Sequence, residues 1–342
     1  MKLNHDIKIS AIICCYHGVK TVYDALCSLE KQSLMKSRYE IIVVDNGSID
    51  GSSVEIDRFV NGVNSSIIDV FKISNEGLSN ARNYGYKKAK GDFVFYMDDD
   101  AYADEMCLEV ILESFLSNPS LNVLGGTVGI LNHDNGFAKL YHNSIFSYWM
   151  EGKSIIIGTN MSFRKSLLIE SEGFIKNLKY RGDESAFFAK NKRLINASVN
   201  KAVIVWHTQP ERLKSFLKSR FENGQAKAFL TLSFDNNAIK AKLKNVFNFL
   251  IRLFSSGIGF ALSVILWFLL SLNFVVIILL ASLWALRFIC HNDLRGSLLM
   301  YVKKDGKSYV LYDYFYIVFF VSLGSFLEDL GYVLSYWKLT FK

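Results

Sequence analysis

Three consecutive aspartates, Asp98, Asp99 and Asp100, follow the apolar segment Phe93–Met97 and are the residues most suited to chemistry. Carboxylates this close repel one another, so a fold that keeps them ionised needs a cation or another compensating partner. In an extended or turning segment Asp98 and Asp100 point to one side while Asp99 points away. Two carboxylates on one side suit a hard divalent cation, so they predict a Mg²⁺ or Mn²⁺ site. A solvated turn, or a helix N-cap by Asp100, is the alternative interpretation.

A second polar cluster runs from Asn75 to Asn83 and contains small residues and Arg82. Asn75 can cap a helix that continues to about Ala89. Backbone N–H groups at a helix start, together with a guanidinium, form a site for an anion such as phosphate. The alternative is an ordinary capped helix with a surface arginine. Asp45, at the end of another apolar segment, could accept hydrogen bonds from a nucleobase or a ribose.

Apolar segments alternate with helical patterns over the first part of the chain. The segments expected to be strands are Lys8–Cys15, Glu40–Val44, 67–73 and Phe93–Met97. Such alternation predicts an α/β fold with a mostly parallel, doubly wound sheet. Ligands of these sheets bind beyond the carboxyl ends of the strands, which is where both Asp45 and the aspartate triplet fall. The sequence contains no Gly-x-Gly-x-x-Gly or Walker-type loop, which argues against nicotinamide and P-loop chemistry.

Four blocks of sequence resemble, in order and spacing, the blocks of glycosyltransferase family 2. They are Ile12–Tyr16, Val43–Ser48, Gly77–Asn83 and Gly91–Asp100. The resemblance extends over about residues 7–225 and implies the GT-A fold, a nucleotide-diphosphate sugar as donor and inversion at the anomeric carbon. The loop after Tyr16 departs from the family's pattern, because His17 stands where the family usually has Asn.

The resemblance assigns roles to individual residues on the donor side. Asp45 would contact the nucleoside and Arg82 the diphosphate, while Asp98 and Asp100 would bind the metal. The full set expected to bind the nucleotide sugar is Tyr16, Asp45, Asn75, Arg82 and Asp99.

An acidic pair, Asp183 and Glu184, stands where the family places acidic residues at the start of a helix. An inverting transfer needs one carboxylate to take the proton of the acceptor hydroxyl. Position favours Glu184 as this base, whereas the family's usual residue type favours Asp183, and both stay candidates. Acids that merely favour a helix N-terminus are the alternative. His207 resembles a late histidine that contacts the metal or the diphosphate, although a histidine after a strand can also be structural.

The charge of the chain is unevenly distributed. The 342 residues include 39 Lys and Arg against 32 Asp and Glu, a net charge of +7. Residues 201–252 hold ten Lys and Arg and three Asp and Glu, so this stretch accounts for the whole net charge. A basic stretch of this kind favours an anionic membrane leaflet. Nucleic-acid binding is not expected, because no DNA- or RNA-binding motif accompanies the charge.

Leu253–Leu286 contains no charged residue. About 20 residues span a bilayer, and basic residues flank the run on both sides, which favours a helical hairpin that turns near Ser271–Asn273. One long tilted helix, or a buried hairpin of a soluble protein, is the alternative. A third apolar segment at about residues 309–327 would cross the membrane or lie at its surface.

These patterns predict three regions: a GT-A domain over residues 1–225, a basic juxtamembrane segment over 226–252, and a membrane-associated tail over 253–342 with its hairpin at about 253–289. Residues 1–9 lack the apolar core of a signal peptide, so the domain is expected in the cytoplasm, at the inner (plasma) membrane. The five cysteines form no C-x-x-C pair.

The function expected from the sequence is a metal-dependent inverting glycosyltransferase. It would move a sugar from a nucleotide sugar, expected to be a UDP-sugar, to a lipid-linked saccharide or another membrane-presented acceptor in cell-surface or exopolysaccharide synthesis. A polyprenyl-phosphate glycosyltransferase is the nearest alternative. A non-catalytic scaffold of a polysaccharide assembly complex is an alternative of another class.

Overall fold

The computed structural model describes residues 7–63, 65–147, 156–176, 178, 182–234, 327–328, 330–332 and 334–335. The chain forms two compact units, residues 1–131 with 154–208, and residues 132–153 with 209–342. The domain boundary predicted at residue 225 stays a prediction, and residue 225 lies inside the helix α8 (Leu213–Phe234).

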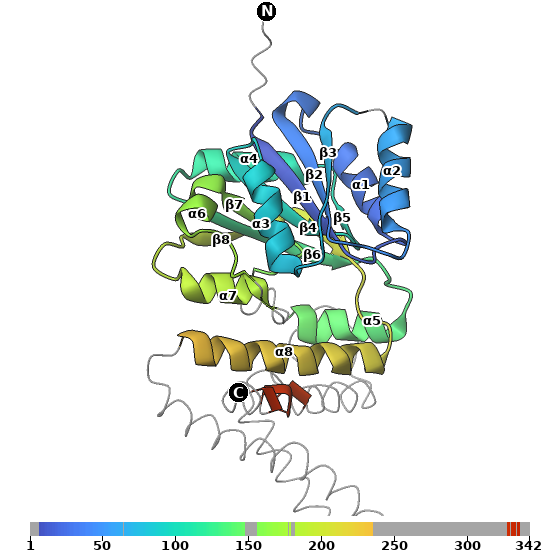
Figure 1. Ribbon diagram of the computed structural model, residues 1–342, viewed down its shortest axis with the longest axis vertical. Helices are drawn as coiled ribbons and strands as arrows, with labels where there is room; N and C mark the ends of the chain where they lie inside the picture. Colours follow the sequence, from blue (N-terminus) through green and yellow to red (C-terminus); the bar gives the residue numbers. More distant parts are fainter. Residues whose placement is uncertain are drawn as a thin grey trace, which may run out of the picture. The chain divides into compact units, whose positions relative to one another are not determined.

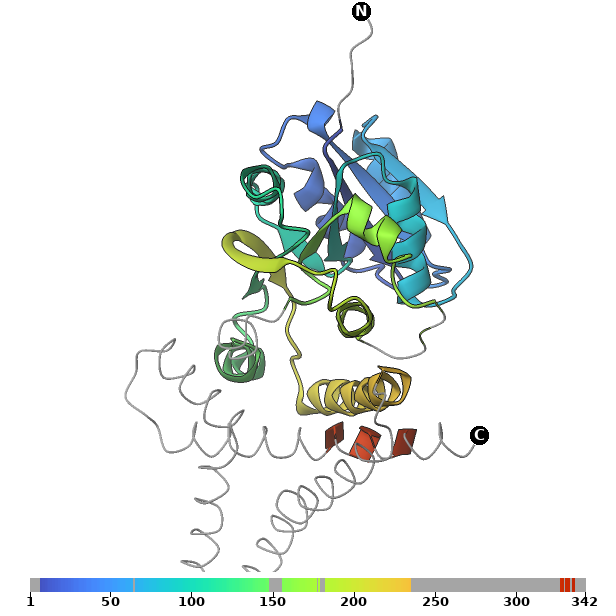
Figure 2. The ribbon, with the colours of Figure 1, turned by 90° about the vertical axis from the view of Figure 1, so that its left-hand side faces the viewer.

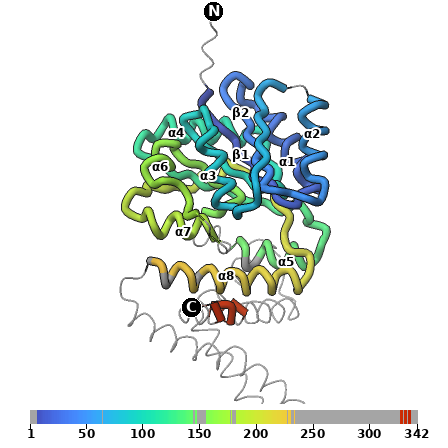
Figure 3. The backbone as a smooth tube through the Cα atoms, viewed as in Figure 1, coloured from blue at the N-terminus to red at the C-terminus, as the bar shows by residue number. Residues whose placement is uncertain are grey.

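The first unit is a sheet with helices on both faces (Figure 1). Its strands are β1 (Ile9–Cys15), β2 (Tyr39–Asp45), β3 (Ile68–Lys72), β4 (Phe93–Asp98), β5 (Ala101–Ala103), β6 (Val123–Ile130), β7 (Met161–Arg164) and β8 (Ala197–His207). Its helices are α1 (Val22–Glu30), the 3₁₀ turn Lys36–Arg38, α2 (Ser52–Val63), α3 (Leu78–Lys88), α4 (Cys107–Ser117), α6 (Lys165–Glu170) and α7 (Asp183–Lys190). The path of the chain through these elements can be followed in Figure 3.

The strand order among the described residues is β3-β2-β1-β4-β7-β6-β8-β5. The first four strands are parallel, as the sequence predicted, but β7 runs antiparallel to both β4 and β6, and β5 runs antiparallel to β8. Because β6 and β8 are parallel to each other, six of the eight described strands run in one direction and only β7 and β5 run in the other, so the sheet is mixed but mostly parallel. Parallel neighbours need a crossover connection. Between β6 and β7 the chain leaves for the second unit instead, and β7 returns in the opposite direction.

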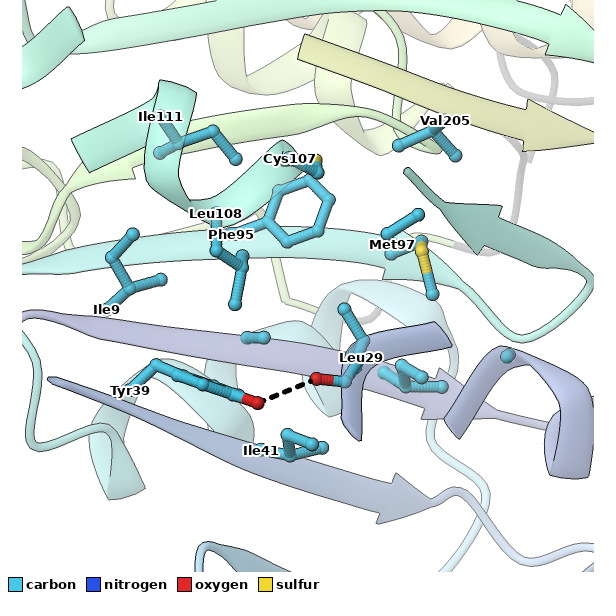
Figure 4. Packing of buried hydrophobic residues seen from close by; sticks show 14 of the residues in the cluster. Ile9, Leu29, Tyr39, Ile41, Phe95, Met97, Cys107, Leu108, Ile111 and Val205 are labelled. Carbon is cyan, nitrogen blue, oxygen red and sulfur yellow. Dashed lines mark hydrogen bonds between the residues drawn. The ribbon is translucent and has the colours of Figure 1, made fainter. Parts of the chain in front are cut away.

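Two apolar clusters hold the helices against the sheet, one on each face (Figure 2). Helices α1, α2 and α4 contribute to the cluster on one face, and α3, α6 and α7 to the cluster on the other. Figure 4 shows part of the first cluster, where the buried Tyr39 hydroxyl donates to the Leu29 carbonyl oxygen over 3.1 Å. Burial raises the pKa of Tyr39 to about 12, so this hydroxyl stays protonated and keeps its hydrogen bond.

Strand alternation decides which side chains of β4 reach the site. Phe95 and Met97 belong to the cluster on the α1 face, and Val94 and Tyr96 to the cluster on the α3 face. Because side chains alternate along a strand, Asp98 at the end of β4 lies on the α3 face.

The second unit contains α5 (Gly136–Tyr141), the π-helical turn His142–Phe146 and α8. Phe216 of α8 packs edge-on against the rings of Phe137 and Tyr141. Among the helices of the described residues, we find none with both the length and the apolar character that a membrane crossing requires. The predicted hairpin, and all of the third apolar segment except residue 327, lie outside the described residues.

Candidate active site

The carboxyl ends of three parallel strands bring the predicted polar residues to one edge of the sheet. In the strand register Cys15 of β1 is paired with Asp45 of β2, and Cys14 of β1 with Asp98 of β4. The loops that follow these strands therefore start side by side, as the sequence predicted for a doubly wound sheet.

The side chains of Asp98, Asp100 and His207 converge at this edge. Each offers one ligand atom, and these atoms all lie within 4.8 Å of one another. His207 is brought there by the antiparallel pairing of β5 and β8, which sets it opposite Ala101, and its Nε2 lies 3.2 Å from Asp100 Oδ1. Two carboxylates and an imidazole fit a divalent cation. The residues predicted as metal ligands are thus close enough to share one ion.

Asp99 points away from that cluster, toward the loop after β1. Its Oδ2 accepts the backbone N–H of Tyr16 over 3.2 Å, and a Cβ at Gly18 would lie only 2.4 Å from the same oxygen. Burial raises the pKa of Asp99 to about 6, and the neighbouring charges of Asp100 and Asp98 act in the same direction. In this structure Asp99 holds the backbone of the loop that carries Tyr16.

Tyr16 and His17 form a stacked aromatic pair, with ring centroids 4.0 Å apart and an interplanar angle of 20°. Tyr16 is 48% exposed. His17 has φ 59°, and its N–H donates to Ser48 Oγ over 3.1 Å. Asn and His both adopt this left-handed conformation more readily than most residues. The backbone thus explains why His17 can stand where the resemblance leads one to expect Asn.

Asp45, the last residue of β2, and Asn75, in the loop after the neighbouring β3, make local hydrogen bonds. The buried carboxylate of Asp45 accepts from the Ser48 N–H over 3.0 Å and from the Ser53 hydroxyl. Asn75 Oδ1 accepts from the Gly77 N–H over 3.1 Å. The predicted cap is wrong by two residues, because α3 begins at Leu78 with Gly77 at φ 94° as its N-cap. A left-handed residue of this kind favours glycine over asparagine.

Arg82 is buried between two carboxylates rather than lying on the surface. It is 3% exposed, with Nη1 2.5 Å from Asp183 Oδ2 and Nη2 3.3 Å from Asp98 Oδ1. A Cβ at Gly158 would stand 2.7 Å from Nη2, so that position is closed to larger residues unless Arg82 moves. Burial opposes the charged form, but Asp183 and Asp98 outweigh it and raise the pKa of Arg82. The guanidinium therefore links the end of β4 to the start of α7.

The acidic pair occupies the first two positions of α7, after Gly182 with φ 89° as N-cap. Asp183 is buried and bound to Arg82, whereas Glu184 is half-buried. Burial raises the pKa of Glu184 to about 7, and the charge of Asp183 adds to the rise. A carboxylate with such a pKa can take up a proton near neutral pH. The environments of the two acids thus favour Glu184 as the base and Asp183 as the partner of Arg82.

Thr159 is a site residue that the sequence reading did not single out. Its hydroxyl donates to Asp98 Oδ2 over 2.5 Å, and Arg82 approaches the other oxygen of that carboxylate. Thr159 belongs to the segment Gly158-Thr-Asn-Met-Ser162, which resembles an acceptor-side block of family 2. That segment was the available signal, but it did not indicate contact with Asp98.

Comparisons with known proteins agree with this architecture. Residues 10–171 match the family model described as glycosyl transferase family 2. A cholesterol galactosyltransferase of Borreliella burgdorferi is 36% identical over 107 residues, which cover 31% of this chain and 29% of the relative. A glucosyl-dolichyl phosphate glucuronosyltransferase of Haloferax volcanii is 26% identical over 192 residues, which cover 52% and 59%. The chain thus spans less than two thirds of the length of these curated relatives.

A solved structure of similar fold is a mannosyltransferase from Pyrobaculum calidifontis in complex with GDP-Man and Mn²⁺. The match has a TM-score of 0.57 and 15% sequence identity, and it covers 95% of this chain and 87% of that one. The fold is accordingly of GT-A type, with the mixed sheet and flanking helices described above.

Proposed function

The domain at residues 10–171 belongs to glycosyl transferase family 2, and on this premise we propose that the chain transfers a sugar from a nucleotide-diphosphate sugar, with inversion, to a membrane-presented acceptor. One observation carries the proposal. The acidic pair at the start of α7 is joined through Arg82 to Asp98, which belongs to a ligand cluster that fits a divalent cation. A base for the acceptor and a cation for the donor would then lie on opposite sides of the Arg82 guanidinium.

On the donor side, Asp98, Asp100 and His207 would hold Mg²⁺ or Mn²⁺. The bound ion would supply Lewis-acid stabilisation of the departing nucleoside diphosphate. Tyr16 and Asn75 lie on the loops after β1 and β3, and Asp45 is the last residue of β2; we place the nucleoside at these three residues. Asp99 would hold the Tyr16 loop in position. We propose a UDP-sugar as the donor.

On the acceptor side, Glu184 would take the proton of the attacking hydroxyl. The new bond forms between that oxygen and the anomeric carbon, on the face opposite the bond to the nucleoside diphosphate, which breaks. Asp183 would remain ion-paired with Arg82 and hold the start of α7 in place. In this proposal Arg82 acts mainly through the two carboxylates, and a contact with the diphosphate would be additional.

We further propose that the acceptor is a lipid-linked saccharide. The names of two relatives specify cholesterol and glucosyl-dolichyl phosphate, which is consistent with lipid acceptors in this part of the family. The charge-free run Leu253–Leu286, preceded by the basic stretch 201–252, supports attachment to the inner (plasma) membrane with the domain in the cytoplasm.

Labelled nucleotide sugars incubated with membranes that contain the full chain test this function. We expect label in a lipid fraction that disappears with EDTA and with Asp98→Asn, and that falls about 10²- to 10⁴-fold with Glu184→Gln. Asp57→Asn, which changes an exposed carboxylate paired with Lys72, is the matched control and should leave the transfer unchanged.

Three other results would contradict parts of the proposal. Absence of metal-dependent transfer from every UDP- and GDP-sugar would contradict the reaction itself. Full transfer in both Glu184→Gln and Asp183→Asn would favour a polyprenyl-phosphate acceptor, whose attacking oxygen needs no strong base. Donor binding without any transfer would favour the non-catalytic scaffold.

A further inference from the structure

Trp206 is a large aromatic residue that remains exposed inside a strand. It precedes His207 at the end of β8, and 38% of its surface is accessible. Its antiparallel partner on β5 is Tyr102, which is half-buried. Residues directly opposite each other in an antiparallel pair lie on the same face of the sheet. Two aromatic residues thus share one face at the sheet edge, and the candidate metal ligand His207 follows Trp206 in the chain.

On its other side, Trp206 is paired with Gly129 of β6. A Cβ at Gly129 would lie 2.3 Å from Cε3 and 2.5 Å from Cζ3 of the indole, closer than any real Cβ contact. The six-membered ring of Trp206 therefore covers the place where a side chain would stand, and it rests on the backbone of β6. The absence of a side chain at Gly129 thus leaves room for the ring, of which part remains exposed to solvent.

Strand alternation places Trp206 on the face of the sheet that also carries α7. Val205 is buried in the cluster with α1 and α4, so Trp206 points to the other face. That other face is covered by α3, α6 and α7, and Phe187 of α7 lies in its cluster. The proposed base Glu184 is on the same helix, while His207 brings the end of β8 to Asp98 and Asp100. Trp206 therefore shares a face of the sheet with the helix of the proposed base, and it lies in the strand that ends at His207.

We propose that Trp206 and Tyr102 form a stacking platform for a pyranose ring of the acceptor. This inference rests on the proposed glycosyl transfer and specifies the acceptor as a saccharide at this position. One face of a pyranose consists of C–H groups, which an indole can cover while the hydroxyl groups at the rim remain hydrated. A nucleobase fits less well, because Tyr16 follows β1, and β4, β7 and β6 lie between β1 and β8 in the sheet.

Saturation-transfer NMR on the full chain with methyl pyranosides of glucose, galactose, mannose and N-acetylglucosamine tests the platform. We expect transfer to ring C–H protons of at least one glycoside, with affinity about tenfold weaker in Trp206→Ala. Trp206→Phe should retain part of the affinity. Gly129→Val, which lifts the ring and leaves Trp206 in place, should weaken binding as Trp206→Ala does.

Leu116→Ala is the matched control, because Leu116 is an apolar residue of α4 that is 59% exposed. It should bind the glycosides as the unchanged chain does, and thermal melting of all variants identifies any loss of fold. The platform is overturned if no glycoside receives saturation, or if Trp206→Ala and Gly129→Val bind as well as the unchanged chain.

Calorimetry with UDP- and GDP-sugars and Mn²⁺ separates this inference from the proposed function. Donor binding combined with glycoside binding that does not depend on Trp206 overturns the platform and leaves the transfer proposal intact. Loss of donor binding in Trp206→Ala, with glycoside binding retained, assigns the ring to the nucleobase and also overturns the acceptor platform. If neither donor nor glycoside binds the unchanged chain, both proposals fail.

Discussion

Arg82 is a buried positive charge whose burial is compensated by two carboxylates, Asp183 and Asp98. Removing one partner of a buried ion pair leaves the other charge unpaired, which costs about 3–5 kcal/mol. We therefore expect Arg82→Ala to lower the free energy of unfolding by about that amount and to abolish transfer. Arg82→Lys keeps the charge but loses the planar fork that reaches both carboxylates, so it should cost less stability and still impair transfer.

Denaturant unfolding and the transfer assay measure these effects. The matched control is Arg58→Ala, since Arg58 is an exposed residue that pairs with Glu55 on α2 and lies over the Tyr23 ring, and loss of these surface contacts should cost only about 1 kcal/mol. Equal stability losses in Arg82→Ala and Arg58→Ala would contradict the linking role of Arg82.

The raised pKa of Glu184 predicts how the reaction depends on pH. A base must be unprotonated to act, so kcat/KM should rise with pH and level off above about 7. Asp183→Asn removes a negative charge that helps to raise this pKa, and the rising limb should shift to lower pH. The measurement is a pH profile with the metal concentration held constant. A limb that stays in place in Asp183→Asn would argue against Glu184 as the titrating base.

The raised pKa of Glu184 also makes the free energy of unfolding depend on pH, in the opposite sense from an acid whose pKa is lowered by folding. Folded Glu184 holds its proton up to about pH 7, whereas the unfolded chain releases it near the ordinary value of 4.5. Between these pH values the folded state binds more protons, so this group's contribution to stability falls as pH rises and is constant above about 7. Unfolding experiments at pH 5 and pH 8 should show this loss, and Glu184→Gln should remove it. An unchanged pH dependence in that variant would contradict the raised pKa.

At the residue scale, the sequence identified the groups but not their pairing. Asp98, Asp100 and His207 were predicted to act together, and the structure brings their ligand atoms within 4.8 Å. The contact of Arg82 with Asp183 joins residues 101 positions apart, which no local pattern indicates. Thr159 was missed for the same reason, because its partner Asp98 lies 61 positions away.

At the scale of elements, the close approach of the segment before β4 to the backbone at the start of β1 depends on one glycine, Gly91. A Cβ at Gly91 would lie 2.8 Å from backbone atoms of Ile9 and Ser10 and 2.9 Å from the Lys8 carbonyl oxygen. Backbone in a sheet cannot yield as a flexible side chain can, so Gly91→Ala should destabilise the fold by about 1–3 kcal/mol.

Gly62→Ala is the matched comparison, because Gly62 lies in α2 and a Cβ there would meet no atom within 4 Å. Alanine is the better helix former, so this variant should gain about 0.5–1 kcal/mol. Thermal and denaturant unfolding of both variants give the signs. If Gly91→Ala and Gly62→Ala lose a similar amount of stability, steric crowding at Gly91 is not the cause of its loss.

The sheet itself was predictable as far as local patterns determine it. Parallel strands buried on both faces are recognisable as short apolar runs, and β1, β2 and β4 lie where such runs were found. The direction of β7 was not predictable, because Met161–Arg164 is only four residues long and pairs antiparallel with distant β4 and β6. The start of α3 was wrong because a glycine with positive φ displaced the expected asparagine cap.

At the scale of the whole molecule, charge is unevenly divided along the chain. The net +7 lies in residues 201–252, and the remainder, which includes the aspartate triplet and the acidic pair, sums to zero. This zero is a balance, because residues 1–200 hold 22 Lys and Arg against 24 Asp and Glu, whereas residues 253–342 hold 7 against 5. The basic stretch precedes the charge-free run, where lysine and arginine favour the cytoplasmic side of a membrane.

The hairpin predicted for Leu253–Leu286 can be tested by labelling with a membrane-impermeant maleimide. Basic residues flank the run at Lys240–Arg252 and again from Arg287 to Lys307, so both flanks should face the cytoplasm. In a background with Cys290→Ser, the thiol of Asn273→Cys should react from outside intact cells. Lys307→Cys should react only after the membrane is opened.

A single tilted helix would reverse the result at Lys307→Cys, because one crossing puts the two flanks on opposite sides. A run buried in protein would leave Asn273→Cys unlabelled from outside, and either outcome would contradict the hairpin.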